Sequence, residues 1–481
     1  MNKDVAWLLY AAQRLLEGAK LNIDIYEINP PISVYFNLPP ALLSKYLSLP
    51  AIPVFYAYMM LVICISLLLC WHLTKLLYKD YLTSRYYILV SMAFITTIWV
   101  NAHLQFGQRE HITVVLLMPY LLAAIVRLQR ENLTLPIALA VGLLAGAGLS
   151  FKPFFLGVWI LVEIYLVFSL KNLSPLWRNE NLIITIFLVL FMLALFIFQS
   201  NYLKIGLLLG KYYLPYNNGY SSVIFSKEVI LWLLTGVVIC LFIKLNHNDK
   251  KAIILLYIAS TGFLLSALVQ QKGWPNHLYP LSASCLFILL LITYQLSVKY
   301  RISKKYILVG LYVIFSGLFA AGMLKMRPDT LWYANITPLP QLIPLVKDYA
   351  RTEPVYALTT ELTPPFPMIN YTGASWPYHF ASLWPLPGFY CNTSDGDRKI
   401  SYHHPDSMSA AERFFLDTVI TDLQTYPPKL LLVDQSEYKM GFGRLNFNFL
   451  DYFSNDPRFL TFLKGYEYLK KVGTYEIYQK R

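Results

Sequence analysis

Carboxylates near the amino terminus are the first residues of this sequence that could carry chemistry. Asp4, Asp24 and Glu27 all precede the first long apolar stretch, and Pro30 and Pro31 stiffen the backbone directly after them. A carboxylate can take the proton of an attacking hydroxyl group, or it can ligate a divalent cation. A solvated acidic loop is the alternative interpretation of the same residues.

A second polar group stands at the start of an apolar stretch. Arg109, Glu110 and His111 would be costly at the mouth of a membrane helix unless they face a cavity or one another. The free N–H groups of a helix start also attract an anion. The residues indicate either an anion site or an Arg–Glu pair that anchors the helix at the membrane surface.

Further cations lie in two short turns. Lys152 has little loop around it, so it either reaches the lipid headgroups or meets a phosphate. Lys272 and His277 lie beside Trp274 and Tyr279, which alternatively are ordinary aromatic residues of the membrane interface. Together with the carboxylates, these cations suit a lipid-linked phosphate as substrate, because Lys and Arg neutralise the phosphate while a carboxylate acts as base or metal ligand.

The elements that must position these residues are apolar stretches between residues 51 and 324. A helix needs about 20 residues to cross about 30 Å of hydrocarbon, and most of the stretches are near this length. The sequence therefore predicts a mostly α-helical membrane protein with about ten spans. They cover 51–74, 86–104, 111–128, 135–150, 154–170, 181–199, 228–246, 252–270, 277–297 and 306–324.

The loops between these stretches differ in charge. Alternate connections carry Lys and Arg, for example Arg127 and Lys171, and the positive-inside rule makes those connections cytoplasmic. The opposite, outer side then holds 1–50, 105–110, 151–153, 200–227, 271–276 and the tail from 325. All the candidate residues named above therefore share one face of the membrane. The spans are nearly free of acids apart from Glu163, which makes a transporter the weaker interpretation.

Composition supports a membrane protein and excludes other classes. Hydrophobic residues make up 57% of the chain and charged residues 14%, with a mean hydropathy of +0.48. The net charge of +13 is spread over short turns, so nucleic acid is not an expected partner. Four of the five cysteines lie within the apolar stretches, which leaves no disulfide framework.

Three regions follow from this pattern. Residues 1–50 form an outer loop that begins with an amphipathic helix over 5–18, residues 51–324 form the membrane part, and residues 325–481 form an α/β domain outside the membrane. In that domain we expect strands at 355–358 and 429–433 and helices at 408–423 and 456–468. An outer start needs either unaided translocation or a preceding helix absent from this sequence, and we favour the second.

The order of these elements resembles the polytopic GT-C glycosyltransferases, the group of protein O-mannosyltransferases, the aminoarabinose transferase of lipid A and bacterial RgtA/B/C/D-like enzymes. The similarity covers the whole chain in architecture, although its motifs are short. Two features depart from the family pattern: no helix precedes the first loop, and Asp4 lacks an adjacent acidic partner. The matching motifs are Asp4 with the helix 5–18, Asn29-Pro30-Pro31, 107–111, Lys152-Pro153 and 272–277.

The resemblance implies inverting transfer of a sugar from a polyprenyl-phosphate donor to a glycan, lipid or protein acceptor, on the outer face of the bacterial inner membrane. It implies Asp4 as the base, with Asp24 or Glu27 as alternatives. It also implies that a divalent cation, Mg²⁺ or Mn²⁺, would be held by Glu110 and Glu27. The donor phosphate would be held by Arg109, His111, Lys152, Lys272 and His277. The competing hypotheses are a flippase for lipid-linked sugars and an inactive membrane scaffold.

Overall fold

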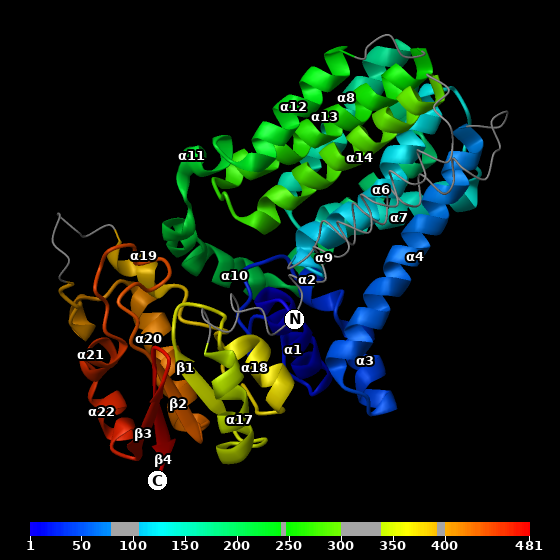
Figure 1. The fold of residues 1–481 in the computed structure, drawn as a ribbon. Coiled ribbons are helices and arrows are strands. Elements are labelled where there is room, and N and C mark those ends of the chain that lie inside the picture. The colour runs from blue at the N-terminus through cyan, green and yellow to red at the C-terminus, as the bar shows by residue number, and fades with distance from the viewer. Residues whose placement is uncertain (78–104, 242–246, 300–337, 392–399) are drawn as a thin grey trace. The chain divides into compact units, whose positions relative to one another are not determined.

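The computed structural model describes residues 1–77, 105–241, 247–299, 338–391 and 400–481 (Figure 1). Contacts divide the chain into two compact units. We call Tyr56–Ala194 with Asn218–Arg327 the helical unit. Met1–Phe55, Leu195–Asn217 and Pro328–Arg481 form the mixed unit, which holds the sheet. The predicted boundaries at 50 and 325 concern membrane topology and remain predictions.

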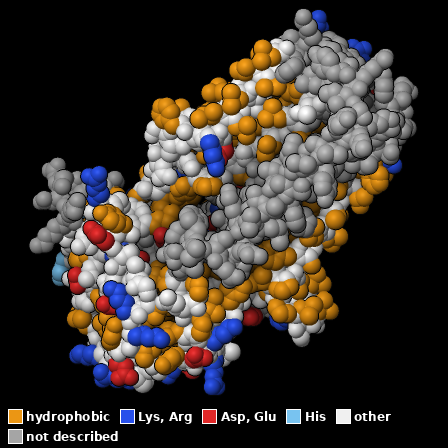
Figure 2. All heavy atoms as spheres, in the orientation of Figure 1, with side chains coloured by type: hydrophobic (Ala, Val, Ile, Leu, Met, Phe, Trp, Pro, Cys, Tyr) orange, Lys and Arg blue, Asp and Glu red, His pale blue; other side chains and the backbone are white. Residues whose placement is uncertain are grey.

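The helical unit is built of helices, most of them long and apolar, and two of them extend beyond its bounds. They are α4 (Ala51–Leu77), α6 (Arg109–Leu128), α7 (Leu135–Ser150), α8 (Leu156–Leu170), α9 (Asn179–Phe198), α11 (Gly219–Ile224), α12 (Lys227–Leu241), α13 (His247–Gln270) and α14 (Pro275–Lys299). Side chains such as Leu190 and Phe196 of α9 and Leu233 of α12 are exposed although apolar. Figure 2 shows hydrophobic side chains gathered over this unit, as expected of a surface that meets lipid.

Six helices in the described part of the chain are long and apolar enough to cross a membrane. They are Ala51–Leu77, Arg109–Leu128, Pro153–Leu170, Asn179–Phe198, Lys250–Gln270 and Pro275–Thr293. Of the other predicted spans, 135–150 is the shorter apolar helix α7, and 228–246 is described only as far as Leu241. The spans at 86–104 and 306–324 lie outside the described residues. The prediction of a mostly helical membrane protein is confirmed, whereas the count of ten is not.

Helix α6 forms the centre of the helical unit, and nearly all its residues are buried. It packs against α7, α13, α14 and α8. Glycine permits the close approach of α7 to α9, because a Cβ atom at Gly142 would lie 2.7 Å from Cβ of Ile183. Small residues allow such approaches between helices in lipid. This packing fixes both ends of α6 relative to its neighbours.

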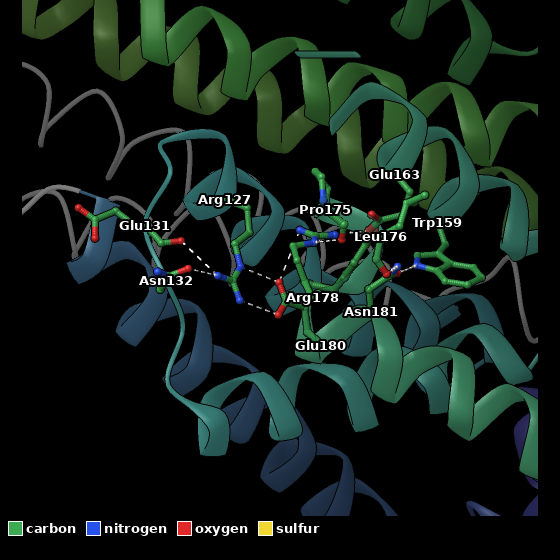
Figure 3. A network of polar contacts seen from close by, with 11 residues as sticks. Arg127, Glu131, Asn132, Trp159, Glu163, Pro175, Leu176, Arg178, Glu180 and Asn181 are labelled. Atoms are coloured by element: carbon green, nitrogen blue, oxygen red, sulfur yellow. Dashed lines mark hydrogen bonds and ion pairs between the residues drawn. The ribbon is translucent and has the colours of Figure 1, made fainter. Parts of the chain in front are cut away.

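A buried network of charges joins the carboxyl end of α6 to α8 and α9 (Figure 3). Arg127 donates from Nε and Nη2 to the two carboxylate oxygens of Glu180, each at 2.9 Å. Arg178 contacts Glu163, which also accepts a hydrogen bond of 2.6 Å from the Tyr120 hydroxyl. The charges of the two arginines and two glutamates balance, and their ion pairs and hydrogen bonds offset the free-energy cost of burying them. The sequence showed Glu163 as an unusual acid but not its partners.

The mixed unit begins with α1 (Lys3–Leu16), the amphipathic helix predicted over 5–18, and Gly18 follows its end with φ of 103°. Next come α2 (Ile32–Tyr35) and α3 (Leu38–Leu47), and later α10 (Ser200–Leu209). The carboxyl-terminal part adds α17 (Leu339–Tyr349), α18 (Pro365–Thr372), α19 (Leu386–Tyr390), α20 (Ala410–Thr425), α21 (Phe449–Ser454) and α22 (Pro457–Leu463). The sheet contains β1 (Val355–Leu358), β2 (Leu430–Asp434), β3 (Tyr466–Val472) and β4 (Tyr475–Lys480).

The sheet has the order β1-β2-β4-β3, in which β1 and β2 are parallel and the other pairs are antiparallel. Both parallel strands are buried throughout, as their continuous apolar sequence predicts. They agree closely with the strands expected at 355–358 and 429–433. The helix expected at 456–468 is only partly correct, because α22 ends at Leu463 and pairing with β4 turns Tyr466–Val472 into a strand.

Helix α1 packs on the carboxyl-terminal part of the mixed unit rather than standing alone. Its Trp7 ring lies 5.1 Å from the Phe366 ring in α18. Arg14 donates to the backbone oxygens of Trp376 and Tyr378, at 3.3 and 3.1 Å. The amino-terminal helix, which begins at Lys3, thus buries its apolar face against the tail of the same chain.

Candidate functional site

A buried polar cluster lies in the helical unit where helix ends meet. The start of α6 supplies Glu110, and the turn after α7 supplies Lys152. The end of α13 supplies Gln270, and the start of α14 supplies Asn276 and His277. These residues are far apart in sequence, so the packing of the helices alone brings them together.

The Lys152 ammonium is the centre of this cluster. It contacts Oε1 of Glu110, and its Nζ lies 3.4 Å from Oε1 of Gln270 and 3.3 Å from Nε2 of His277. Asn276 donates from Nδ2 to the same oxygen of Glu110 at 3.2 Å. Glu110 is 0% exposed, and Lys152 and His277 are each 6% exposed. An ion pair this deeply buried needs such additional hydrogen bonds to offset its desolvation.

Several polar atoms of the cluster have no hydrogen-bond partner among the described residues. They are Nη1 of Arg109, Oε2 of Glu110 and Nδ1 of His277. A lysine ammonium only donates, so Nε2 of His277 accepts from Lys152 and its proton is assigned to Nδ1. Two of the three atoms are therefore buried donors, and a buried donor without a partner is costly unless a ligand satisfies it.

Lys272 lies in the turn between α13 and α14, with Nζ 5.0 Å from the centre of the Trp274 ring. The pKa of Lys272 is lowered to about 7, mainly by burial and also by the nearby cations Lys152 and Arg109, while Glu110 acts in the opposite direction. Hydrogen bonds hold this turn: the Gly273 N–H donates to Oγ of Ser222 at 3.2 Å, and the Asn218 N–H donates to the Gln271 backbone oxygen at 3.0 Å. A side chain at this glycine would collide with the Ser222 backbone oxygen, at 2.5 Å from the Cβ.

The charges of the cluster favour an anion over a metal ion. Within the part of the chain that the structure describes, the cluster holds the cations Arg109, Lys152 and Lys272 and one carboxylate, that of Glu110. No group of three or more His, Cys, Asp or Glu residues that could hold a metal ion occurs among the residues that the structure describes. Hard divalent cations require several oxygen ligands. The surroundings of Glu110 therefore do not fit the expected Mg²⁺ or Mn²⁺.

His111 has a different setting from the other predicted phosphate ligands. Its ring is fully buried between Phe106 and Tyr279, with ring centres 4.9 and 5.8 Å away. Its Nδ1 accepts a hydrogen bond of 3.1 Å from the Gly107 N–H. These contacts give His111 a structural task in the turn before α6.

The three predicted catalytic carboxylates lie in the mixed unit. Glu27 is buried and accepts hydrogen bonds from Nε1 of Trp7 at 2.8 Å and from N and Nδ2 of Asn29 at 2.8 and 2.6 Å. Asp24 accepts from the backbone N–H of Lys20 at 2.7 Å. Asp4 lies in the first turn of α1, and its carboxylate accepts no hydrogen bond from the described residues.

Gln270 and Asn276 belong to the cluster, but the sequence did not indicate them as site residues. Both lie in the polar run 270–277 beside the predicted ligands Lys272 and His277. An amide side chain is common at helix ends for capping alone, so its type carries little information. Only the position of these amides beside Glu110 and Lys152 reveals their part in the cluster.

Comparison with known proteins gives a fold for the whole chain. No family model and no curated protein sequence matches it. The crystal structure of ArnT from Cupriavidus metallidurans bound to undecaprenyl phosphate aligns over 99% of this chain and 93% of that chain, with a TM-score of 0.55 and 10% identity. The apo structure of ArnT from the same organism aligns over 99% and 92%, with a TM-score of 0.49 and 11% identity. The chain therefore has the fold of ArnT, and its resemblance to the GT-C group is confirmed at the level of the fold.

Proposed function

We propose that this protein transfers a sugar from a polyprenyl-phosphate donor to an acceptor on the outer face of the bacterial inner membrane. The shared fold with ArnT, whose structure holds undecaprenyl phosphate, supports this proposal. The apolar helices of the helical unit offer the surface against which a polyprenyl chain can lie. The acceptor is a glycan, a lipid or a protein.

The buried cluster around Lys152 is the observation that carries the proposal. It combines an excess of cations with buried donors that have no partner among the described residues, inside a unit built of apolar helices. A phosphate monoester or diester would meet both needs, since its oxygens accept several hydrogen bonds and its charge balances the cations. Arg109, Lys152 and Lys272 are the residues to which we assign the phosphate.

In the reaction, the acceptor oxygen attacks the anomeric carbon of the sugar from the side opposite the phosphate. The bond from that carbon to the phosphate oxygen breaks, and polyprenyl phosphate leaves with the electron pair. The three cations stabilise the negative charge that develops on the leaving oxygen. A carboxylate takes the acceptor's proton. Attack opposite the leaving group inverts the configuration at the anomeric carbon.

Asp4 is the preferred base because its carboxylate is the least engaged of the three. Glu27 is held by three hydrogen bonds, and Asp24 closes a turn with the Lys20 N–H. Carboxylate oxygens that already accept hydrogen bonds are less available to the hydroxyl group of an acceptor. Asp4 also lies in the first turn of a helix, and its part-exposed side chain leaves room for an acceptor hydroxyl.

A transfer assay tests the proposal. The full chain, reconstituted in liposomes, is supplied with undecaprenyl-phosphate sugars labelled in the sugar, together with a membrane extract as acceptor. We expect label in a new product for the wild type and at least a hundredfold loss for Lys152→Met. The exposed Arg130→Met serves as the matched control and should keep full activity. Label that only crosses the bilayer, without a new product, would favour a flippase instead.

A further inference from the structure

A pocket lies in the mixed unit, at the carboxyl end of β2. It measures about 740 Å³, a size typical of ligand sites. Its wall begins at Gln435, the residue directly after β2, and ligands of α/β sheets commonly bind outside the carboxyl ends of parallel strands. The remaining lining comes from residues near 400 and from Ser436 to Asp451.

One aromatic side of the pocket is rigid. The ring of Tyr402 meets the ring of Phe447 edge-on, with centres 5.3 Å apart. The Tyr402 hydroxyl donates to the Asn448 backbone oxygen at 3.2 Å and accepts from the Asn448 N–H at 2.8 Å. Both ends of the tyrosine are thus fixed, and its half-buried ring is a preformed apolar surface.

The loop after β2 is held in place by its own buried contacts. Lys439 is only 5% exposed, and its Nζ donates to the Ser436 backbone oxygen at 2.6 Å. Asp434 accepts a hydrogen bond of 2.9 Å from the Ser436 N–H, and Gln435 donates from Nε2 to Glu476 at 3.0 Å. The loop therefore presents its remaining side chains in a defined arrangement.

The rim of the pocket carries exposed side chains of several kinds. They are Glu437, Tyr438, Arg444, Asn446 and Asp451. Tyr438 is 67% exposed, so its ring is open to a molecule that enters the pocket. The lining holds two acids, Glu437 and Asp451, and two bases, Lys439 and Arg444, so it has no excess of either charge.

This chemistry discriminates between classes of ligand. A phosphate or other anion would need an excess of cations, as in the cluster around Lys152, and a metal ion would need converging carboxylates. The groups of the pocket suit a neutral saccharide. The hydroxyl groups of a sugar both donate and accept hydrogen bonds, so they can pair with the amide, carboxylate and guanidinium groups of the pocket, and the C–H face of a sugar can stack on an aromatic ring.

We propose that this pocket binds a short neutral oligosaccharide, the acceptor end of the glycan that the protein extends. The assignment as acceptor rests on the proposed transferase function, whereas the binding of a saccharide does not. Tyr438 supplies the ring on which a sugar stacks, and Asn446 supplies hydrogen bonds to its hydroxyl groups. Lys439 is a positioning residue for the loop.

The test is binding to the full chain in nanodiscs, measured by saturation-transfer NMR with maltotriose, chitotriose and mannotriose as probes. We expect at least one trisaccharide to bind, and Tyr438→Ala and Asn446→Ala each to weaken its binding at least tenfold. Tyr349→Ala is the matched control, because this tyrosine is also exposed in the mixed unit but does not line the pocket. It should change affinity less than twofold.

The proposal is wrong if no trisaccharide binds, or if the affinity of a trisaccharide that does bind is the same in Tyr438→Ala and Asn446→Ala as in the wild type. It is also wrong if only inorganic phosphate binds in the pocket. Undecaprenyl phosphate binding is measured in the same preparations. Donor binding without saccharide binding would overturn the pocket alone. The opposite result is also informative: the protein binds a saccharide, Tyr438→Ala abolishes this binding, and yet the protein binds no donor and transfers no sugar. The saccharide pocket would then stand, and the proposed transferase function would be wrong.

Discussion

Lys152 and Glu110 form an ion pair in the interior of the helical unit, although 42 residues separate them in the sequence. The pair links the turn after α7 to the start of α6, and no side chain of the pair is more than 8% exposed. Glu110 neutralises part of the positive charge of the cluster, to which Arg109 and Lys272 also contribute. The pair thus fixes the geometry of the site as well as its charge.

Removing one member of this pair should destabilise the protein strongly. Lys152→Met leaves the Glu110 carboxylate buried without its main partner, which typically costs about 3–5 kcal/mol. The double variant Glu110→Gln/Lys152→Met should recover most of this loss, because neither charge is then left alone. Thermal unfolding in detergent measures both effects. Equal melting temperatures for the single and double variants would contradict the pairing.

Donor binding should depend on pH through Lys272. Its pKa is lowered to about 7 in the folded protein, so it is mostly neutral at pH 8 and mostly charged at pH 6. Its contribution to stability has the opposite trend. Between pH 7 and the ordinary pKa of lysine only the unfolded chain holds the proton, so stability falls as the pH falls through this range and changes no further below it. A bound phosphate would offset that loss of stability.

We therefore expect the affinity for undecaprenyl phosphate to rise when the pH is lowered from 8 to 6. The rise should be roughly tenfold larger for the wild type than for Lys272→Met. The phosphate of the donor also titrates in this range, but it does so for both proteins. Comparing the two proteins therefore isolates the effect of Lys272. Native mass spectrometry or fluorescence quenching at several pH values measures it. Parallel pH profiles would show that Lys272 does not meet the phosphate.

The network of Arg178 and Glu163 should matter for stability and not for donor binding. Arg178→Met leaves Glu163 buried with only the Tyr120 hydroxyl as partner, and we expect a loss of about 3–5 kcal/mol. Arg130→Met, at an exposed position of the same region, should change stability by less than about 0.5 kcal/mol. Thermal unfolding distinguishes them, and an unchanged melting temperature for Arg178→Met would refute the structural role.

Asp4 and Asp24 should behave differently when replaced. Asp4→Asn removes the proposed base, so transfer should fall at least a hundredfold while donor affinity stays within twofold. Asp24→Asn keeps an acceptor for the Lys20 N–H, and transfer should be almost unchanged. Initial rates and donor affinities are measured on the same preparations. Loss of transfer in Asp24→Asn alone would move the base to that residue.

Sequence patterns predicted the parts of this protein that depend on local chemistry. Apolar stretches indicated α4, α6 and α13, and continuous apolar runs indicated β1 and β2. Charge sorting of the loops also predicted that Lys152 and Lys272 lie near Glu110, because alternate helix ends share one membrane face.

Other features depend on packing between distant segments and leave no local signal. The partners of Glu163 come from two other helix regions, and the hydrogen bonds of Glu27 come from α1 and Asn29. The strand that begins at Tyr466 has a charged, weakly apolar sequence, so only its pairing with β4 makes it a strand. Pairing of this kind depends on segments that the local pattern does not connect.

The central claim is that the cluster around Lys152 holds the phosphate of a polyprenyl donor. The most direct measurement is the affinity of undecaprenyl phosphate for the full chain in nanodiscs, compared with that of Glu110→Gln/Lys152→Met, in which the pair is removed without leaving a buried charge. We predict at least a tenfold weaker affinity for the double variant and an unchanged affinity for Arg130→Met. Equal affinity of the wild type and the double variant would contradict the claim.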